Sequence, residues 1–225
     1  NILLLFFIIT FNYEQFVELP KATANQLAEE THERVGAVIG SILMAIVVIM
    51  FYFKGSFNFD KKAKFLKILA QIWVFLNAIL VISAMLKNTE YVYYLGLTYK
   101  RLGVYAFLSL AIIGLIFTFV KIQKQKTNAY LFNQMFWYVY GTILVCSFIN
   151  WGGIITSHNL KREDFAANYH FNSVDFNDKQ LLEYYQKTNN KEMYKILKDK
   201  IIARQNKSFL SKVLYDESIS FNESK

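Results

Sequence analysis

The sequence predicts an all-α fold, namely a polytopic transmembrane helical bundle followed by a small helical tail outside the membrane. Hydrophobic residues make up 54% of the 225 residues, whereas soluble domains hold about 45–50%. These residues are concentrated in a few long blocks, which is typical of a chain that crosses a membrane several times. Only one proline is present to interrupt a helix.

Four blocks are long enough to be complete spans, and the chain begins inside a fifth. Residues 35–53 form the clearest block, because these 19 residues carry no charge and match a hydrocarbon core of roughly 30 Å at about 1.5 Å per residue. The first apolar run lacks the flanking features of a signal peptide, so we interpret it as the end of a span. The predicted spans are about 1–11 (truncated), 35–53, 66–85, 103–120 and 136–155.

This pattern divides the chain into a transmembrane helical domain, residues 1–155, and a helical extramembrane tail, residues 156–225. Helices are predicted over 179–187 and 191–205, and the second has an apolar stripe of Met193, Ile196, Ile201 and Ile202. Short amphipathic helices bury little apolar surface alone. We therefore expect the tail to pack on the membrane domain, on the acidic segment of residues 12–34, or on a partner.

The distribution of lysine predicts the orientation. The loops after the second and fourth spans hold eight lysines together, whereas those after the first and third hold five basic residues. Because cytoplasmic loops are the more basic ones, the lysine loops are predicted inside, and the connector of residues 91–103 and the tail outside. These loops also account for the net charge of +8, so no nucleic-acid partner is predicted.

The connector, residues 91–103, is aromatic and basic. Its tyrosines suit a membrane interface, with the ring near the acyl chains and the hydroxyl in water. Gly96 permits a turn, Gly103 a close helix approach, and Arg101 a contact with an anionic headgroup or an acidic partner. A plain aromatic belt with one interfacial arginine explains the same residues.

Within the spans, small and polar residues point to helix packing. Gly36 and Gly40 form a small-xxx-small pair, for contact with a neighbouring span or with another subunit. Asn77 lies in mid-span, where we expect an interhelical hydrogen bond, the alternative being a substrate contact. No charged residue occupies the centre of a complete span, which argues against a proton-coupled pump.

The sequence shows no catalytic set and predicts no cofactor. Glu29 and His32 have a spacing used in di-iron bundles, but no second pair exists. His32, His158 and His170 fall on one predicted side, so a zinc site is conceivable, although a solvated helix face with unrelated histidines is better supported. Cys146, alone in an apolar run, is expected to be a core hydrophobe.

Three segments resemble a family of bacterial multi-spanning inner-membrane proteins known only as a domain of unknown function, the 4153/4173 group. They are residues 94–101 (Tyr-Leu-Gly-Leu-Thr-Tyr-Lys-Arg), residues 150–160 (Asn-Trp-Gly-Gly-Ile-Ile-Thr-Ser-His-Asn-Leu), and an aspartate before a Tyr/Leu-rich helix at 174–185. Departures are Leu95 within the Tyr-Gly pair, Gly152 in place of an acid and His158 in place of tyrosine.

The resemblance, over about residues 19–185, implies a multi-pass protein of the bacterial inner membrane, and it implies no reaction. Together with the lysine distribution, this location predicts a periplasmic tail. The residues that carry it are our candidates for ligand or partner contacts: Tyr94, Gly96, Thr98, Arg101, Asn150, Trp151, His158 and Asn159.

These features favour a structural, assembly or sensory subunit of an envelope complex, with the lipid bilayer and other proteins as partners. A transporter or channel for a small solute, with Gln71, Asn77 and Thr142 along a polar path, is the first alternative. The second is an enzyme acting on a lipid or cell-wall precursor at the outer interface. It would place Arg101 on a phosphate with Asn150, His158 and Asn159 nearby.

Overall fold

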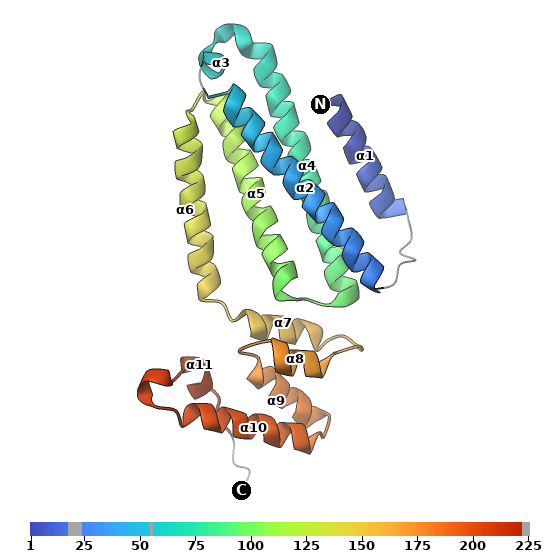
Figure 1. Ribbon diagram of the computed structural model, residues 1–225, viewed down its shortest axis with the longest axis vertical. Coiled ribbons are helices and arrows are strands. Elements are labelled where there is room, and N and C mark those ends of the chain that lie inside the picture. The colour runs from blue at the N-terminus through green and yellow to red at the C-terminus, as the bar shows by residue number, and fades with distance from the viewer. Residues whose placement is uncertain (18–23, 55, 222–225) are drawn as a thin grey trace. The chain divides into compact units, whose positions relative to one another are not determined.

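The structure, a computed structural model, describes the backbone of residues 1–17, 24–54 and 56–221 (Figure 1). Side chains are described for the same residues except 14–17, 24–34, 56, 61 and 210. Over these ranges every regular element is a helix. The elements are α1 (Ile2–Val17), α2 (Ala24–Tyr52), α3 (Ser56–Phe59), η1 (Lys61–Ala63), α4 (Lys64–Leu95), α5 (Tyr99–Gln123), α6 (Asn128–Ser147), α7 (Trp151–Asn159), α8 (Ala167–Ser173), α9 (Asp178–Lys187), α10 (Lys191–Gln205), η2 (Phe209–Ser211) and α11 (Leu214–Glu217).

The chain divides into two compact units. The first comprises Asn1–Leu95 and Lys100–Phe148, and the second comprises Gly96–Tyr99 and Ile149–Lys225. The second unit is therefore discontinuous in sequence, because it takes up the loop between α4 and α5. The predicted connector is largely helical, since α4 ends at Leu95 and α5 begins at Tyr99.

Among the described residues, three helices are long and apolar enough to cross a membrane, namely Val35–Tyr52 of α2, Lys64–Leu95 and Tyr99–Gln123. A fourth span is reached if α6 and α7 are counted as one interrupted span, and a shorter apolar helix covers Ile2–Tyr13. The predicted helical membrane fold is confirmed. The predicted count of four complete spans agrees only when the interrupted pair is included.

The span predicted over 136–155 is not continuous. α6 ends at Ser147, and a new helix begins at Trp151. Asn150 is the N-cap of that helix, since its Oδ1 accepts a hydrogen bond from the backbone N–H of Gly153 at 2.9 Å. The apolar run continues through this break, so hydrophobicity alone did not reveal it.

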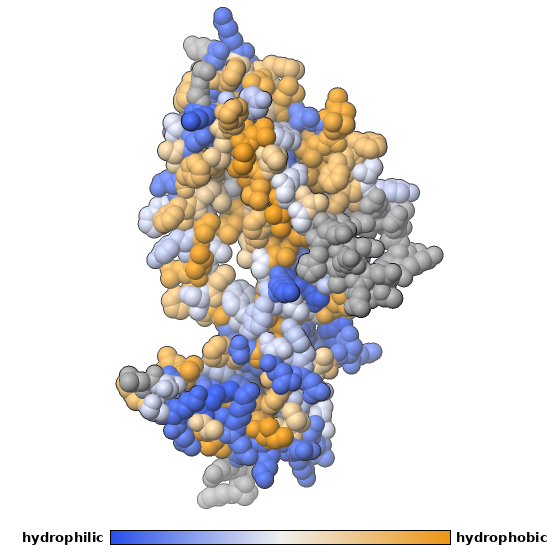
Figure 2. Space-filling view, in the orientation of Figure 1, coloured by the Kyte–Doolittle hydropathy of each residue, from blue (hydrophilic) through white to orange (hydrophobic). Residues whose placement is uncertain are grey.

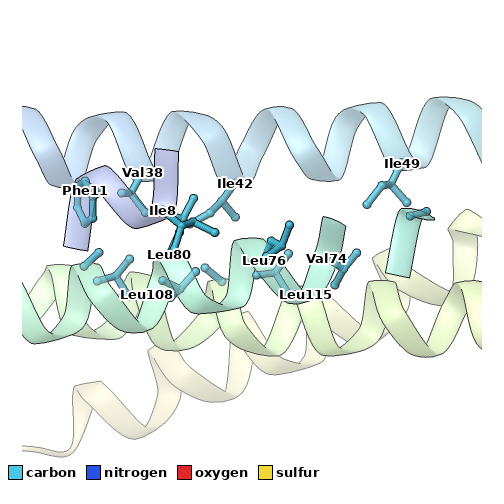
Figure 3. Close-up of a cluster of buried hydrophobic side chains, with 14 of the residues drawn as sticks. Ile8, Phe11, Val38, Ile42, Ile49, Val74, Leu76, Leu80, Leu108 and Leu115 are labelled. Carbon is cyan, nitrogen blue, oxygen red and sulfur yellow. The ribbon is translucent and has the colours of Figure 1, made fainter. Parts of the chain in front are cut away.

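The core of the first unit lies between α1, α2, α4 and α5. Val38, Ile42, Ala45 and Ile49 recur at helical spacing on α2 and are at most 1% exposed. They face Leu80 and its neighbours on α4, with Ile8 and Phe11 of α1 beside them (Figure 3). Leu108 and Leu115 of α5 belong to the same cluster. Close packing of these apolar stripes joins the helices.

The outer faces of these helices are also apolar. On α2 the exposed residues include Leu43, Met44 and Val47, and α6 exposes Phe136, Trp137 and Ile143. Figure 2 shows broad hydrophobic surface on the visible face of this unit. A helix that is hydrophobic on all sides is suited to lipid rather than to water.

Polar residues hold the ends of the helices together at one end of the first unit. Lys121 is fully buried near the end of α5, not in a loop as predicted, and its Nζ donates to the Phe53 carbonyl at 3.2 Å. Asn128 Nδ2 donates to the Met50 carbonyl at 3.2 Å. These donors satisfy carbonyls that the end of α2 leaves unpaired.

The second unit has its own small core. Leu181, Leu182 and Tyr185 of α9 pack with Leu197 and Ile201 of α10. The predicted helices at 179–187 and 191–205 are confirmed within one residue. The predicted stripe of α10 is partly wrong, because Leu197 is fully buried whereas Ile196 is 46% exposed.

An ion-pair cluster joins α11 to α9 and α10. Arg204 Nη2 lies 2.6 Å from Asp178 Oδ2 and 3.1 Å from Asp216 Oδ1. Gln205 Nε2 donates to the carbonyls of Asp216 and Ile219. Both carboxylates are thus engaged with an arginine inside the fold.

Replacing Leu80 by alanine tests the core of the first unit. Leu80 is fully buried, so Leu80→Ala should destabilise the unit by on the order of 2 kcal/mol, the low end for such changes because lipid also offers an apolar environment. The control, Ile82→Ala, removes a side chain that is 51% exposed and should have little effect. Unfolding by sodium dodecyl sulfate in mixed micelles measures both, and equal losses would contradict the assigned core.

Candidate functional site

The loop between α4 and α5 is held within the second unit by the side chain of Asn159. Asn159 Oδ1 accepts a hydrogen bond from the backbone N–H of Leu97 at 2.7 Å, and its Nδ2 donates to the Leu97 carbonyl at 2.9 Å. The primary amide thus pairs with both backbone groups of one residue, as a neighbouring β-strand would. Leu97 and Asn159 are both buried, so these backbone groups depend on the amide for their hydrogen bonds.

The turn into this loop depends on a glycine. Gly96 has φ of +81°, a left-handed conformation that side chains rarely adopt. A Cβ at Gly96 would lie 2.9 Å from Asn159 Oδ1. Both the backbone conformation and the close approach of Asn159 therefore require glycine, and the predicted turn at Gly96 is found.

A buried histidine extends this network. His170 Nε2 lies 3.1 Å from Asn159 Nδ2, and His170 Nδ1 lies 2.9 Å from Thr156 Oγ1. Asn177 Nδ2 donates to Thr156 Oγ1 and to the His170 carbonyl, each at 2.9 Å. The residues come from α7, α8 and the start of α9, so the network joins these short helices.

The geometry assigns the tautomer of His170. Because Asn159 Oδ1 accepts from Leu97, its Nδ2 must face His170, and Nε2 of the imidazole must accept. The proton then sits on Nδ1 and is donated to Thr156 Oγ1. Burial lowers the pKa of His170 from its ordinary value, because the charged form would lose its hydration. A second proton would also place two donors against each other.

Gly152 is required by the close approach of another segment. A Cβ at this position would lie 1.7 Å from the Asp175 carbonyl oxygen. The hydroxyl of Tyr99 is 3.5 Å from the same oxygen. Any side chain here would displace the turn before α9, so an acid cannot occupy this position in the present packing.

A polar cleft lies between α7 and α9, and we call it the α7–α9 cleft. Its volume is about 440 Å³, and it is open to solvent. The lining residues are Asn150, Gly153, Ile154, Ser157, His158, Lys161 and Gln180. Six of them recur at helical spacing from the N-cap of α7 onward, and Gln180 closes the cleft from α9. None of the lining residues is acidic.

The predicted site residues do not all meet. Asn150 and His158 line the α7–α9 cleft, whereas Asn159 points into the buried network beside Leu97. Arg101 belongs to the first unit, where its Nη1 donates to the Leu95 carbonyl at 2.9 Å and its guanidinium lies 4.0 Å from the centre of the Tyr91 ring. It thus satisfies a carbonyl at the end of α4.

The remaining connector and α7 candidates are dispersed. Tyr94, next to the last residue of α4, is 45% exposed, and its ring lies edge-on to that of Tyr93 at 5.3 Å between centroids. Thr98 lies in the loop held by Asn159, and Trp151 is the half-buried first residue of α7. No close helix approach occurs at Gly103, because no described atom lies within 4 Å of a Cβ there.

The polar residues within the spans do not form a path. Asn77 is fully buried, and its Nδ2 donates to the Trp73 carbonyl of its own helix at 2.8 Å, so the predicted interhelical bond is wrong for this group. Thr142 Oγ1 donates to the Tyr138 carbonyl of its own helix at 2.7 Å. Gln71 is half-buried. The bonds of Asn77 and Thr142 thus stay within one helix, whereas Ser83 Oγ of α4 donates to Asn12 Oδ1 of α1 at 2.8 Å.

Gly36 and Gly40 remain open on α2. No described atom lies within 4 Å of a Cβ built at either position. Packing of this pair against another described helix of the chain is therefore not found. Contact with a different subunit is the alternative that stays a prediction.

The predicted zinc alternative lacks its ligands among the described side chains. No group of three His, Cys, Asp or Glu residues gathers there in a way that could hold a metal ion. Both ring nitrogens of His170 are engaged with Thr156 and Asn159, and His158 is exposed in the cleft. The side chains of His32 and Glu29 lie outside the described residues.

Some site residues were not predicted. Ser157 and Lys161 share one face with Asn150 and His158, and the polar residues at helical spacing could have revealed them. Thr156, Asn177 and Gln180 gave no such signal, because their roles arise from tertiary contacts.

The fold and the site define a helical membrane protein of the multi-pass class whose second unit carries a polar cleft. Residues 1–181 match the family described as Domain of unknown function (DUF4153). This is well over half of the chain, which therefore belongs to that family, as its motifs predicted. The match starts at residue 1 and ends in α9, so it includes the whole α7–α9 cleft. No curated protein and no solved structure matches the chain.

Removing the Asn159 amide should release the loop. Asn159→Leu leaves two backbone groups of Leu97 buried and unpaired, at about 1–3 kcal/mol each, so we expect hydrogen-exchange protection of the Leu97 amide to fall more than tenfold. Asn172→Leu is the matched control, since Asn172 is exposed on α8. Unchanged protection in Asn159→Leu would contradict the pairing.

Protonation of His170 should weaken the same network. Its pKa is lowered in the folded protein, so the unfolded chain binds more protons near and below the ordinary value of 6.5. Stability is therefore complete above pH 6.5 and declines as the pH falls from 6.5 toward the folded pKa. Protection factors across residues 96–99, measured between pH 7.5 and about 5, should follow this decline. His170→Gln should flatten the profile, and a profile unchanged by this substitution would exclude His170 as its source.

Proposed function

We propose that the protein is a structural, assembly or sensory subunit of a membrane complex in the bacterial cell envelope. The observation that carries this proposal is the open Gly36–Gly40 face of α2. Small residues allow two helix backbones to approach closely, and such approach is a main source of helix association in lipid. A face that no described helix of this chain covers is suited to a helix from another subunit.

Localisation in the inner membrane, with the lysine-rich loops in the cytoplasm and the second unit in the periplasm, is part of this proposal. It is supported by the greater number of lysines in the loops after the second and fourth predicted spans. Within the described residues after Ser147 no helix is by itself long and apolar enough to span, which suits a unit outside the membrane.

The two alternatives have less support. A transporter needs polar groups directed toward a common path, whereas Asn77 and Thr142 donate to carbonyls of their own helices. An enzyme at the interface would need the Arg101 guanidinium for a phosphate, but Arg101 already donates to the Leu95 carbonyl and lies over the Tyr91 ring. The acids Asp178 and Asp216 are paired with Arg204 and do not line the α7–α9 cleft.

Leucine substitution of the glycines tests the proposed interface. Gly36→Leu with Gly40→Leu should prevent close helix contact, so partners that co-purify in mild detergent at native abundance should be reduced at least tenfold. Gly141→Leu is the matched control, because Gly141 on α6 is also without a described neighbour within 4 Å. Quantitative mass spectrometry of the purified material measures the effect.

Two results would contradict this function. One is a wild-type chain that purifies as a stable monomer with no partner. The other is equal recovery of partners from the double variant and from the Gly141→Leu control.

A further inference from the structure

We propose that the α7–α9 cleft binds a phosphate ester that carries a neighbouring hydroxyl, the chemistry of a phosphoglycerol group. This inference goes beyond the proposed subunit function and does not depend on it. It rests on the charge of the cleft, on its floor and on one buried acceptor.

The charge of the cleft favours an anion. Lys161, in the turn after α7, contributes a positive charge, and His158 near the end of α7 lines the same cleft. Ser157 adds a hydroxyl, which can donate to a phosphate oxygen. All three are exposed side chains, and no carboxylate lies among the lining residues to oppose an anion. Lysine acts on phosphate as a point charge, so it requires no fixed geometry.

The floor of the cleft presents two amides. A Cβ at Gly153 would lie 2.9 Å from Asn150 Nδ2 and 3.0 Å from Gln180 Nε2. Glycine therefore lets both amides approach the α7 backbone closely at the edge of the cleft. Asn150 is fixed in place, because its Oδ1 accepts from the Gly153 N–H and its Nδ2 donates to the Phe176 carbonyl at 2.9 Å. Such a pre-organised floor needs little ordering when a ligand binds.

A buried acceptor in the cleft wall favours a ligand that carries a hydroxyl group. Gln180 Oε1 is shielded from solvent and has no hydrogen-bond partner among the described residues. A buried acceptor without a donor is unfavourable by about 1–3 kcal/mol. The terminal torsion of glutamine is broad, so the amide can turn and bring Oε1 to the cleft in place of Nε2. A ligand hydroxyl would then supply the donor, whereas a phosphate dianion alone would bring mainly acceptors.

Phosphoglycerol occurs in lipid headgroups and in soluble glycerol phosphate. The chain allows either source, because the cleft begins at Asn150, three residues after the end of α6 at Ser147. A headgroup would reach the cleft from the bilayer, and a soluble ester would reach it from water.

Two binding measurements on the full chain in nanodiscs test the proposal. In one, native mass spectrometry follows retention of phosphatidylglycerol against phosphatidylcholine. In the other, sn-glycerol 3-phosphate is titrated into protein held in phosphatidylcholine nanodiscs, with fluorescence as the signal. Retention of the lipid with weak binding of the ester identifies a headgroup site, and the reverse identifies a soluble ligand. Either result supports the proposal.

Substitutions test whether the ligand binds in the α7–α9 cleft. Lys161→Gln should weaken it about tenfold, in line with a hydrogen bond to a charged group. Lys191→Gln, an exposed lysine on α10 outside the cleft, should leave it unchanged. Gln180→Leu should remove the preference for glycerol phosphate over inorganic phosphate. The proposal is overturned if neither probe binds, or if binding withstands both Lys161→Gln and Gln180→Leu. Partner recovery is not read in these assays, so their failure leaves the subunit proposal untouched.

Discussion

The pairing of the Asn159 amide with the backbone of Leu97 is the constraint on which the second unit depends. A loop that is buried must find partners for its N–H and C=O groups, and here one side chain supplies both. The pairing also constrains the residues around it. It demands a left-handed glycine at Gly96, and it leaves Nδ2 of Asn159 facing an imidazole that can accept only while neutral. His170 in turn organises Thr156 and, through it, Asn177.

The first unit obeys a different constraint, because its helices are apolar on every side. Association there rests on shape, so buried aliphatic stripes meet while polar groups turn back to carbonyls nearby. Thr118 and Asn77 illustrate this, since each donates to a carbonyl of its own helix. The polar groups that line an open cleft lie in the second unit, along α7.

The sequence predicted the helical membrane class, because runs of apolar residues decide it without reference to tertiary structure. It also identified Gly96, Asn150 and Asn159 from motifs, although it did not assign their roles. The break after Ser147 escaped prediction, since the residues on both sides are apolar and a capping asparagine is a short-range signal. The partnership of Leu97 with Asn159 joins positions 62 apart, and no local pattern reports such a contact.

The same hydrogen bonds limit how many times the chain between Leu97 and Asn159 can cross the bilayer. Leu97 precedes α5, and Asn159 follows α6, so two long helices separate the bonded groups in sequence. If both groups lie outside the membrane, they lie on one side of it, and the chain between them then crosses it an even number of times. If α5 crosses once, α6 must cross back, although only α5 is apolar enough to be recognised as a span by itself. The pairing of the Asn159 side chain with Leu97 thus constrains whether α6 crosses the membrane, which hydropathy alone does not decide.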